Sequence, residues 1–128
     1  MLPAQARLRR RPEFTAVVRS GRRVGRPTMV IHFLPGRGAA GGAGSARAGF
    51  VVGRTVGGSV ARHRVTRRLR ALVRDELPRL PATADLVVRA RPEAADADFE
   101  SLRRDLRSAL DRVLAAPPVR PDGTGARP

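Results

Sequence analysis

The sequence contains no cysteine, tryptophan, tyrosine or lysine. Without cysteine the chain forms no disulfide and no thiolate zinc site, and its two histidines alone are a poor basis for a structural metal site. No apolar stretch approaches the roughly 20 residues of a membrane span, and the basic N-terminus lacks the apolar run of a secretory signal. We therefore expect a cytoplasmic protein.

Acidic residues are also scarce: 11 Asp and Glu stand against 26 basic residues, which gives a net charge of +15. Every basic residue is arginine, which fits the codon bias of a GC-rich genome. Codon bias does not explain the excess of charge, because Asp and Glu were also available. A small domain this basic repels itself unless an anionic partner offsets the charge. Nucleic acid is the first candidate partner, and an anionic membrane surface is the second.

Hydrophobic periodicity and turn residues predict helices and strands in the order α-β-β-β-α-β-α. They are expected at residues 12–19, 24–26, 28–34, 48–53, 59–77, 85–90 and 99–114. This order predicts one α+β domain over residues 1–116, with helices packed on a single sheet. A basic arm (1–11), a flexible Gly/Ala-rich loop (36–46) and a disordered tail (117–128) complete the expected organisation.

The helix expected after Gly57 and Gly58, with Ser59 as its N-cap, has two different faces. Val65, Leu69, Leu72 and Val73 gather on one side, and the other side carries His63, Arg64, Arg67, Arg70 and Arg74. The run from Arg54 to Arg74 holds seven arginines and no acid. A solvated helix face is the plain alternative, but such a face usually mixes signs so that Glu and Arg pair. Because guanidinium groups bind phosphate through paired donors, the run predicts a surface for a polyanion.

The sequence shows no constellation of catalytic residues. The serines lack a nucleophile-elbow context, and the Gly-rich stretches form neither a Walker loop nor a dinucleotide fingerprint. Four acids lie near the start of the last helix, at Asp96, Asp98, Glu100 and Asp105. Capping by Asp98 and pairing with Arg103, Arg104 and Arg107 account for them better than a metal site does. We expect neither catalytic nor metal-binding residues on the protein.

The segment Arg47–Arg74 resembles the protein component of bacterial ribonuclease P. The motifs that carry the resemblance are Arg47-Ala-Gly-Phe-Val-Val, then Val56-Gly57, then Val60-Ala-Arg62-His63-Arg64-Val65-Thr66-Arg67-Arg68. Leu8 to Gly21 is similar to the family's first-helix signature, and Asp85 to Pro92 is similar to its last strand. The resemblance covers about residues 7–115.

The resemblance implies a two-layer α-β sandwich, ribosomal protein S5 domain 2-like, whose four-stranded sheet contains a left-handed β-α-β crossover. That hand is an exception to the general rule. It also implies that a large RNA, with Mg²⁺, removes the 5′ leader of precursor tRNA, while the protein binds both the catalytic RNA and the leader. The implied partners are therefore the catalytic RNA and precursor tRNA, with no DNA and no membrane, and Mg²⁺ would be bound mainly by the RNA.

The resemblance also implies roles for particular residues. Contacts to the catalytic RNA would be made by Arg54, Arg62, His63, Arg64, Arg67, Arg68, Arg70 and Arg74. A cleft between the first helix and the sheet would bind the leader and would involve Phe14, Val18 and His32. Phe14 is interpreted either as a stacking surface for an unpaired base or as core packing. Since the chain has only four aromatic residues, we expect charge contacts to carry more of the leader binding.

Three other functions stay open on the sequence. A ribosomal-type structural rRNA-binding protein would be just as basic and compact. A helix-turn-helix DNA-binding regulator fits less well, because the basic helix lies between strands with no short helix before it. A self-sufficient nuclease would cut RNA without an RNA subunit, which we do not expect of this chain.

Overall fold

A computed structural model describes residues 7–8, 11–36 and 46–115. Its four-stranded sheet has the order β1-β2-β4-β3, with β1 at Arg22–Gly25, β2 at Met29–Leu34, β3 at Arg47–Val51 and β4 at Asp85–Ala90. β2 pairs antiparallel with β1 and β4, and β3 pairs parallel with β4. The helices are α1 (Arg11–Ser20), α2 (Ser59–Glu76) and α3 (Phe99–Ala115), and short 3-10 helices span Leu77–Arg79 and Pro92–Ala95. The predicted element order and the α+β class are confirmed.

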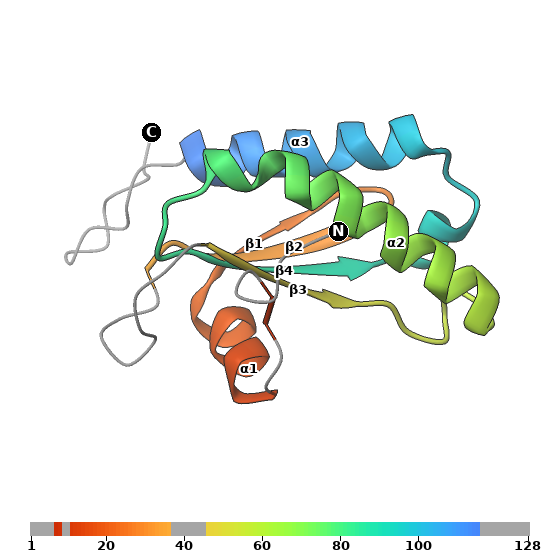
Figure 1. The fold of residues 1–128 in the computed structure, drawn as a ribbon, viewed down its shortest axis with the longest axis horizontal. Coiled ribbons are helices and arrows are strands. Elements are labelled where there is room, and N and C mark those ends of the chain that lie inside the picture. Colours follow the sequence, from red (N-terminus) through yellow and green to blue (C-terminus); the bar gives the residue numbers. More distant parts are fainter. Residues whose placement is uncertain (1–6, 9–10, 37–45, 116–128) are drawn as a thin grey trace.

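The helices cover the two faces of the sheet unequally. α2 and α3 lie side by side on one face, and α1 lies on the other (Figure 1). The main core lies under α2 and α3 and includes Met29, Ile31, Phe33, Leu86 and Val88 from the sheet. A smaller cluster under α1 consists of Leu8, Val17 and Val87, with Phe14 and Leu34 packed against it. The sheet and the α2/α3 layer form the sandwich, whereas α1 covers only part of the opposite face.

The apolar side of α2 is the one that the periodicity predicts, since Val65, Leu69, Leu72 and Val73 are all buried. The predicted N-cap is wrong: the cap is Gly58, without a side-chain hydrogen bond, and Ser59 already lies in the first turn. The reason is the backbone of Gly57, whose φ of +150° is a conformation that favours glycine and turns the chain one residue earlier.

α3 uses its acids differently from the prediction. The backbone N–H of Ser101 donates to Asp98 Oδ1 at 2.7 Å, which confirms the cap. Hydrogen bonds from the side chain and then from the backbone of Ser101 lower the pKa of Asp98. Asp105, however, is buried and forms no ion pair with an arginine of the described residues. It accepts from the N–H and the hydroxyl of Thr28, at 3.0 and 2.7 Å, and so connects the start of β2 to α3. Phe99 is 36% exposed rather than part of the core, and the Arg103 guanidinium lies 5.6 Å from its ring centroid.

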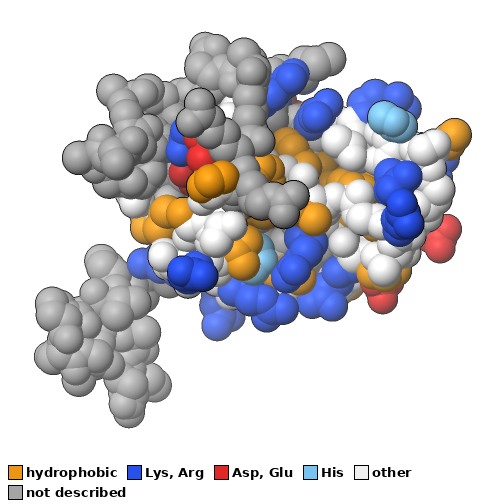
Figure 2. All heavy atoms as spheres, turned by 90° about the horizontal axis from the view of Figure 1, so that it is seen from below, with side chains coloured by type: hydrophobic (Ala, Val, Ile, Leu, Met, Phe, Trp, Pro, Cys, Tyr) orange, Lys and Arg blue, Asp and Glu red, His pale blue; other side chains and the backbone are white. Residues whose placement is uncertain are grey.

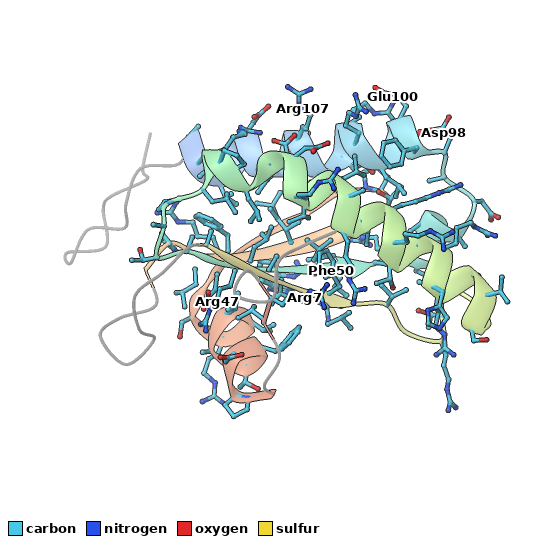
Figure 3. The ribbon with its side chains drawn as sticks, in the orientation of Figure 1. Arg7, Arg47, Phe50, Asp98, Glu100 and Arg107 are labelled. Atoms are coloured by element: carbon cyan, nitrogen blue, oxygen red, sulfur yellow. The ribbon has the colours of Figure 1, made fainter. Side chains whose placement is uncertain are left out.

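An ion-pair cluster attaches α1 to the sheet. Arg47 donates to both carboxylate oxygens of Asp85, at 2.9 and 2.8 Å, and to Glu13 of α1 at 3.0 Å. The hydrogen bond with Asp85 raises the pKa of Arg47 above its usual value. Figure 3 shows Arg47 beside α1. Since Asp85 is buried, loss of Arg47 would remove the guanidinium that its carboxylate pairs with, at a cost of several kcal/mol. The cluster therefore sets the position of α1 over the sheet.

Several predictions fall on parts of the chain that the structure does not describe. Most of the loop (37–45), the tail and most of the basic arm lie outside the described residues. Of the arm, Leu8 donates its N–H to the carbonyl of Ala48 at 2.9 Å, and Arg7 forms a parallel bridge with Ala48, so the chain runs along the β3 edge. The hand of the β3-α2-β4 crossover stays a prediction. Within the described ranges, no helix is long and apolar enough to cross a membrane.

Candidate nucleic-acid interface

The outer side of α2 carries four arginines and a histidine, and most of these arginines have no acidic partner among the described residues. We call His63, Arg64, Arg67, Arg70 and Arg74 the α2 arginine face. Among the described residues, Arg64, Arg67 and Arg70 form no ion pair. Arg74 comes within 3.8 Å of Asp75, and both side chains are exposed, so this pair contributes little. The charge of this face is therefore free to attract an anion.

The other predicted RNA-binding residues lie around this face. Arg62 and His63 line a surface hollow of about 230 Å³ near the N-terminus of α2, with Val52, Ser59 and Thr66. Arg68 donates to the carbonyl of Ala97 at 3.3 Å, so it braces α2 against the segment before α3. Arg54 is exposed in the turn after β3. The structure thus groups the predicted residues on and beside one helix, with Arg68 turned toward the neighbouring layer.

The exposed side of α3 is rich in arginine but mixes signs. Arg103 lies 3.8 Å from Glu100, and Arg107 lies 3.7 Å from Glu76. Arg79 pairs with Glu76 at 2.9 Å and also with Asp111. Glu100 and Arg107 both point away from the sheet in Figure 3. Because these charges offset one another, α3 has the pattern of a solvated helix face and α2 does not.

A hollow of about 460 Å³ lies between α1 and the rim of the sheet. Its lining consists of Phe14, Thr15, Val18, Arg19 and Val51, and we call it the α1 hollow. Val18 and Val51 are 46% and 40% exposed, which is unusual for valine and makes the hollow largely apolar. Phe14 also packs on the small core under α1, and its ring lies so close over Gly49 that any Cβ there would clash with it. Phe14 is thus both a core residue and a surface residue.

His32 is not a direct contact residue of this hollow. It lies on the α1 side of the sheet, yet its side chain is only 2% exposed, so little of its ring is open to a ligand. Burial, followed by the charges of Arg89 and Arg23, lowers the pKa of His32. A role of His32 in the leader cleft stays a prediction, and its buried ring is not among the residues that line the hollow.

Further arginines, which the sequence patterns did not indicate, lie on the same side of the sheet. Arg23 pairs in register with His32, and Arg89 pairs with Val51, so all four side chains point to the α1 side. Both arginines are exposed, and Arg19 joins them from α1. Figure 2 shows basic side chains gathered next to hydrophobic ones on this side of the molecule. The sequence contains only a weak indication of these arginines: Arg89 is the one charged residue inside an otherwise apolar run.

Two basic surfaces on opposite faces of the sheet therefore characterise the molecule, one along α2 and one beside α1. A family model described as Ribonuclease P matches residues 2–114. The chain belongs to the ribonuclease P protein family. The ribonuclease P protein component of Streptomyces griseus is 52% identical over 118 residues, which cover 89% of this chain and 96% of that protein. That of Salinispora tropica is 48% identical over 129 residues, with coverage of 90% and 95%.

Solved structures of ribonuclease P proteins share the fold. The protein from Thermotoga maritima aligns with a TM-score of 0.69 and 27% identity, over 84% of this chain and 96% of that one. The protein from Staphylococcus aureus aligns with a TM-score of 0.72 and 20% identity, over 84% and 94%.

Membership in the ribonuclease P family places the chain in an endoribonuclease complex of tRNA processing and implies association with the RNA subunit of that complex. It excludes the ribosomal-type alternative.

Proposed function

We propose that this ribonuclease P family member binds the catalytic RNA through the α2 arginine face and the 5′ leader of precursor tRNA in the α1 hollow, and that the RNA performs the cleavage. The observation that carries the proposal is the row of guanidinium groups on α2, of which Arg64, Arg67 and Arg70 have no acidic partner in the described part of the chain. Its buried side, from Val65 to Val73, anchors the helix on the core, so the charges are held in a fixed spacing. A rigid array suits the backbone of a folded RNA, because phosphate contacts supply most of such affinity.

The α1 hollow has the features that a single-stranded nucleic acid requires. Proteins bind such strands by combining an aromatic or apolar platform for bases with cations for phosphates. Phe14, Val18 and Val51 form the platform, and Arg19 supplies a cation in the lining itself. The unpaired leader is the part of a precursor tRNA that fits this description.

Chemistry by the RNA agrees with the inventory of the protein. In the described ranges, no three His, Asp or Glu side chains form a group that could hold a metal ion. The acids near α3 are engaged, since Asp105 accepts from Thr28, and Glu76 and Asp111 pair with arginines. These residues do not fit a Mg²⁺ site, and we assign Mg²⁺ mainly to the RNA subunit. The cysteine-free sequence suits a reducing compartment, in line with a cytoplasmic location.

Reconstitution tests this function. Precursor tRNA is incubated with the catalytic RNA of the same organism at low Mg²⁺, with and without the protein. We expect cleavage to be stimulated when the protein is present, and to be stimulated less for a substrate with a one-nucleotide leader. The protein alone should leave the RNA intact. Cleavage by the protein alone, or the absence of any stimulation, would contradict the proposal.

A further inference from the structure

On the α1 side of the sheet, the buried side chain of His32 contacts the exposed side chain of Arg89. His32 lies on β2, and Arg89 lies on the neighbouring strand β4. His32 Nε2 and Arg89 Nη2 are 3.4 Å apart, at the long end of hydrogen-bond distance. The two side chains share a face because His32 pairs with Val87, two positions before Arg89 on β4.

The chemistry of the two groups sets the direction of this contact. A guanidinium only donates, so the imidazole accepts through the lone pair of Nε2 and carries its proton on Nδ1. Burial and the nearby charges of Arg89 and Arg23 lower the pKa of His32, which keeps the ring neutral. A carboxylate would hold the guanidinium but would offset its charge. A neutral imidazole orients Arg89 and leaves the full charge available to an anion.

His32 is also a poor choice for packing alone. Its Nδ1 is buried and has no hydrogen-bond partner among the described residues. A buried polar atom without a partner is costly, and an aliphatic side chain on this strand would avoid that cost. The contact with Arg89 explains a histidine at this position, whereas packing alone does not.

Arg89 lies beside the α1 hollow, although it is not among the residues that line it. It pairs in register with Val51, which lines the hollow. The described part of the chain offers Arg89 no other hydrogen bond or ion pair, and its side chain is exposed, so four of its five donors are free for a ligand. Arg19 lines the same hollow from α1, and Arg23 is exposed beside His32 on β1. An apolar floor with cations at its rim matches bases and phosphates of one strand.

We infer that His32 is a positioning residue, whose neutral ring holds the Arg89 guanidinium at the rim of the α1 hollow, where Arg89 binds a phosphodiester of the leader. This inference rests on the proposed function, which places the leader in the hollow. The contact between Arg89 and the leader phosphate would compensate for the small number of aromatic side chains that can stack on leader bases.

A double-variant cycle in the reconstituted ribonucleoprotein tests the inference. Dissociation constants are measured for precursor tRNA with its leader and for mature tRNA, and their ratio reports the contribution of the leader. Arg89→Gln should reduce this ratio about fivefold through the lost phosphate contact. His32→Leu should reduce it about threefold, because Arg89 is no longer held in place. In the Arg89→Gln background, His32→Leu should cause no further loss.

Two more variants separate positioning from packing. His32→Gln offers an amide oxygen as a neutral acceptor and should restore the ratio to within about twofold of the original. Arg112→Gln removes the same charge from the exposed end of α3, where Arg112 has no ion pair with any described residue, and should leave the ratio unchanged. Thermal melting of each variant shows whether it is folded.

The outcomes distinguish the inference from the proposed function. If the original protein binds both tRNAs equally, the leader site itself fails. If the original protein prefers the precursor and His32→Leu keeps the full ratio, the positioning role is overturned. Independent losses from His32→Leu and Arg89→Gln, or a His32→Leu loss that His32→Gln does not rescue, overturn it as well.

Discussion

Phe14 belongs to two environments at the scale of a single residue. One side of its ring packs with Leu8, Val17 and Val87 and lies against Gly49, and its remaining surface lines the α1 hollow. A substitution there changes the small core and the ligand surface together. A useful experiment must therefore separate the two effects.

Phe14→Ala should weaken the binding of leader-bearing precursor tRNA more than the binding of mature tRNA. Stacking of a base on an aromatic ring contributes about 1–3 kcal/mol, and only the precursor has the unpaired bases. Phe14→Leu is the matched variant: it keeps apolar packing on Gly49 and should preserve thermal stability while losing most of the leader contribution. Equal losses for both tRNAs with Phe14→Ala would refute the placement of the leader.

His32 should make the stability of the free protein depend on pH. Its pKa is lowered from 6.5 in the folded state, so the unfolded chain takes up a proton more readily. The contribution is fully present above about pH 6.5 and is lost as pH falls through the folded pKa, with a slope of at most about 1.4 kcal/mol per pH unit. Urea unfolding at neutral and mildly acidic pH should show a smaller loss for His32→Leu than for the original protein. His63→Gln, on the exposed side of α2, is the control, and the hypothesis fails if all three proteins lose the same stability.

At the scale of elements, α2 and α3 form a natural comparison. Both are amphipathic, both pack on the same side of the sheet, and both carry several arginines. They differ in which arginines are paired with acids. Glu76, Glu100 and Asp111 form ion pairs with arginines on and beside α3. α2 has six arginines and α3 has four, but the acidic partners of these arginines separate the two helices more clearly than their number does.

Replacing Arg64, Arg67 and Arg70 together with Gln should weaken assembly with the catalytic RNA by at least about tenfold, because three phosphate contacts are lost. The apolar side of α2 is unchanged, so circular dichroism should show a folded protein. The matched control replaces Arg103, Arg104 and Arg107 on α3 with Gln, which removes the same charge from a surface of mixed sign. If the α2 variant binds the RNA as tightly as the α3 variant does, the α2 arginine face is not the RNA surface.

At the scale of the whole molecule, the chain has a net charge of +15, and its described residues place arginines on both faces of one sheet. If both surfaces bind RNA as proposed, the affinity should depend strongly on salt. If roughly five phosphates are neutralised, the plot of log affinity against log salt concentration should have a slope near −4. The α2 triple variant should make this slope shallower by about 2 to 3, and the α3 variant should not. A slope near zero for the original protein would contradict a mode of binding led by the RNA backbone.

Local sequence patterns were sufficient for the helices, the strands and the character of α2. A helical period places Val65, Leu69, Leu72 and Val73 on one side whatever surrounds them, and the same period places the α2 arginines on the other. Capping by Asp98 is equally local, since it involves a residue three positions away. The resemblance in Arg47–Arg74 pointed to the family for the same reason, because it is a property of one continuous segment.

Contacts between distant segments were decided only by the tertiary structure. Three such features depend on strand register and on where helices dock. They are the burial of His32, the pairing of Arg89 with Val51 and the hydrogen bond from Thr28 to Asp105. A shift of one residue in a strand would reverse which side each of its side chains faces, and no local pattern contains that information. By itself the sequence determined which segments are helical or extended and that α2 presents cations. The packing of α1 and the pairing of the strands determined which side chains surround the hollow, because that outcome depends on residues far apart in the chain.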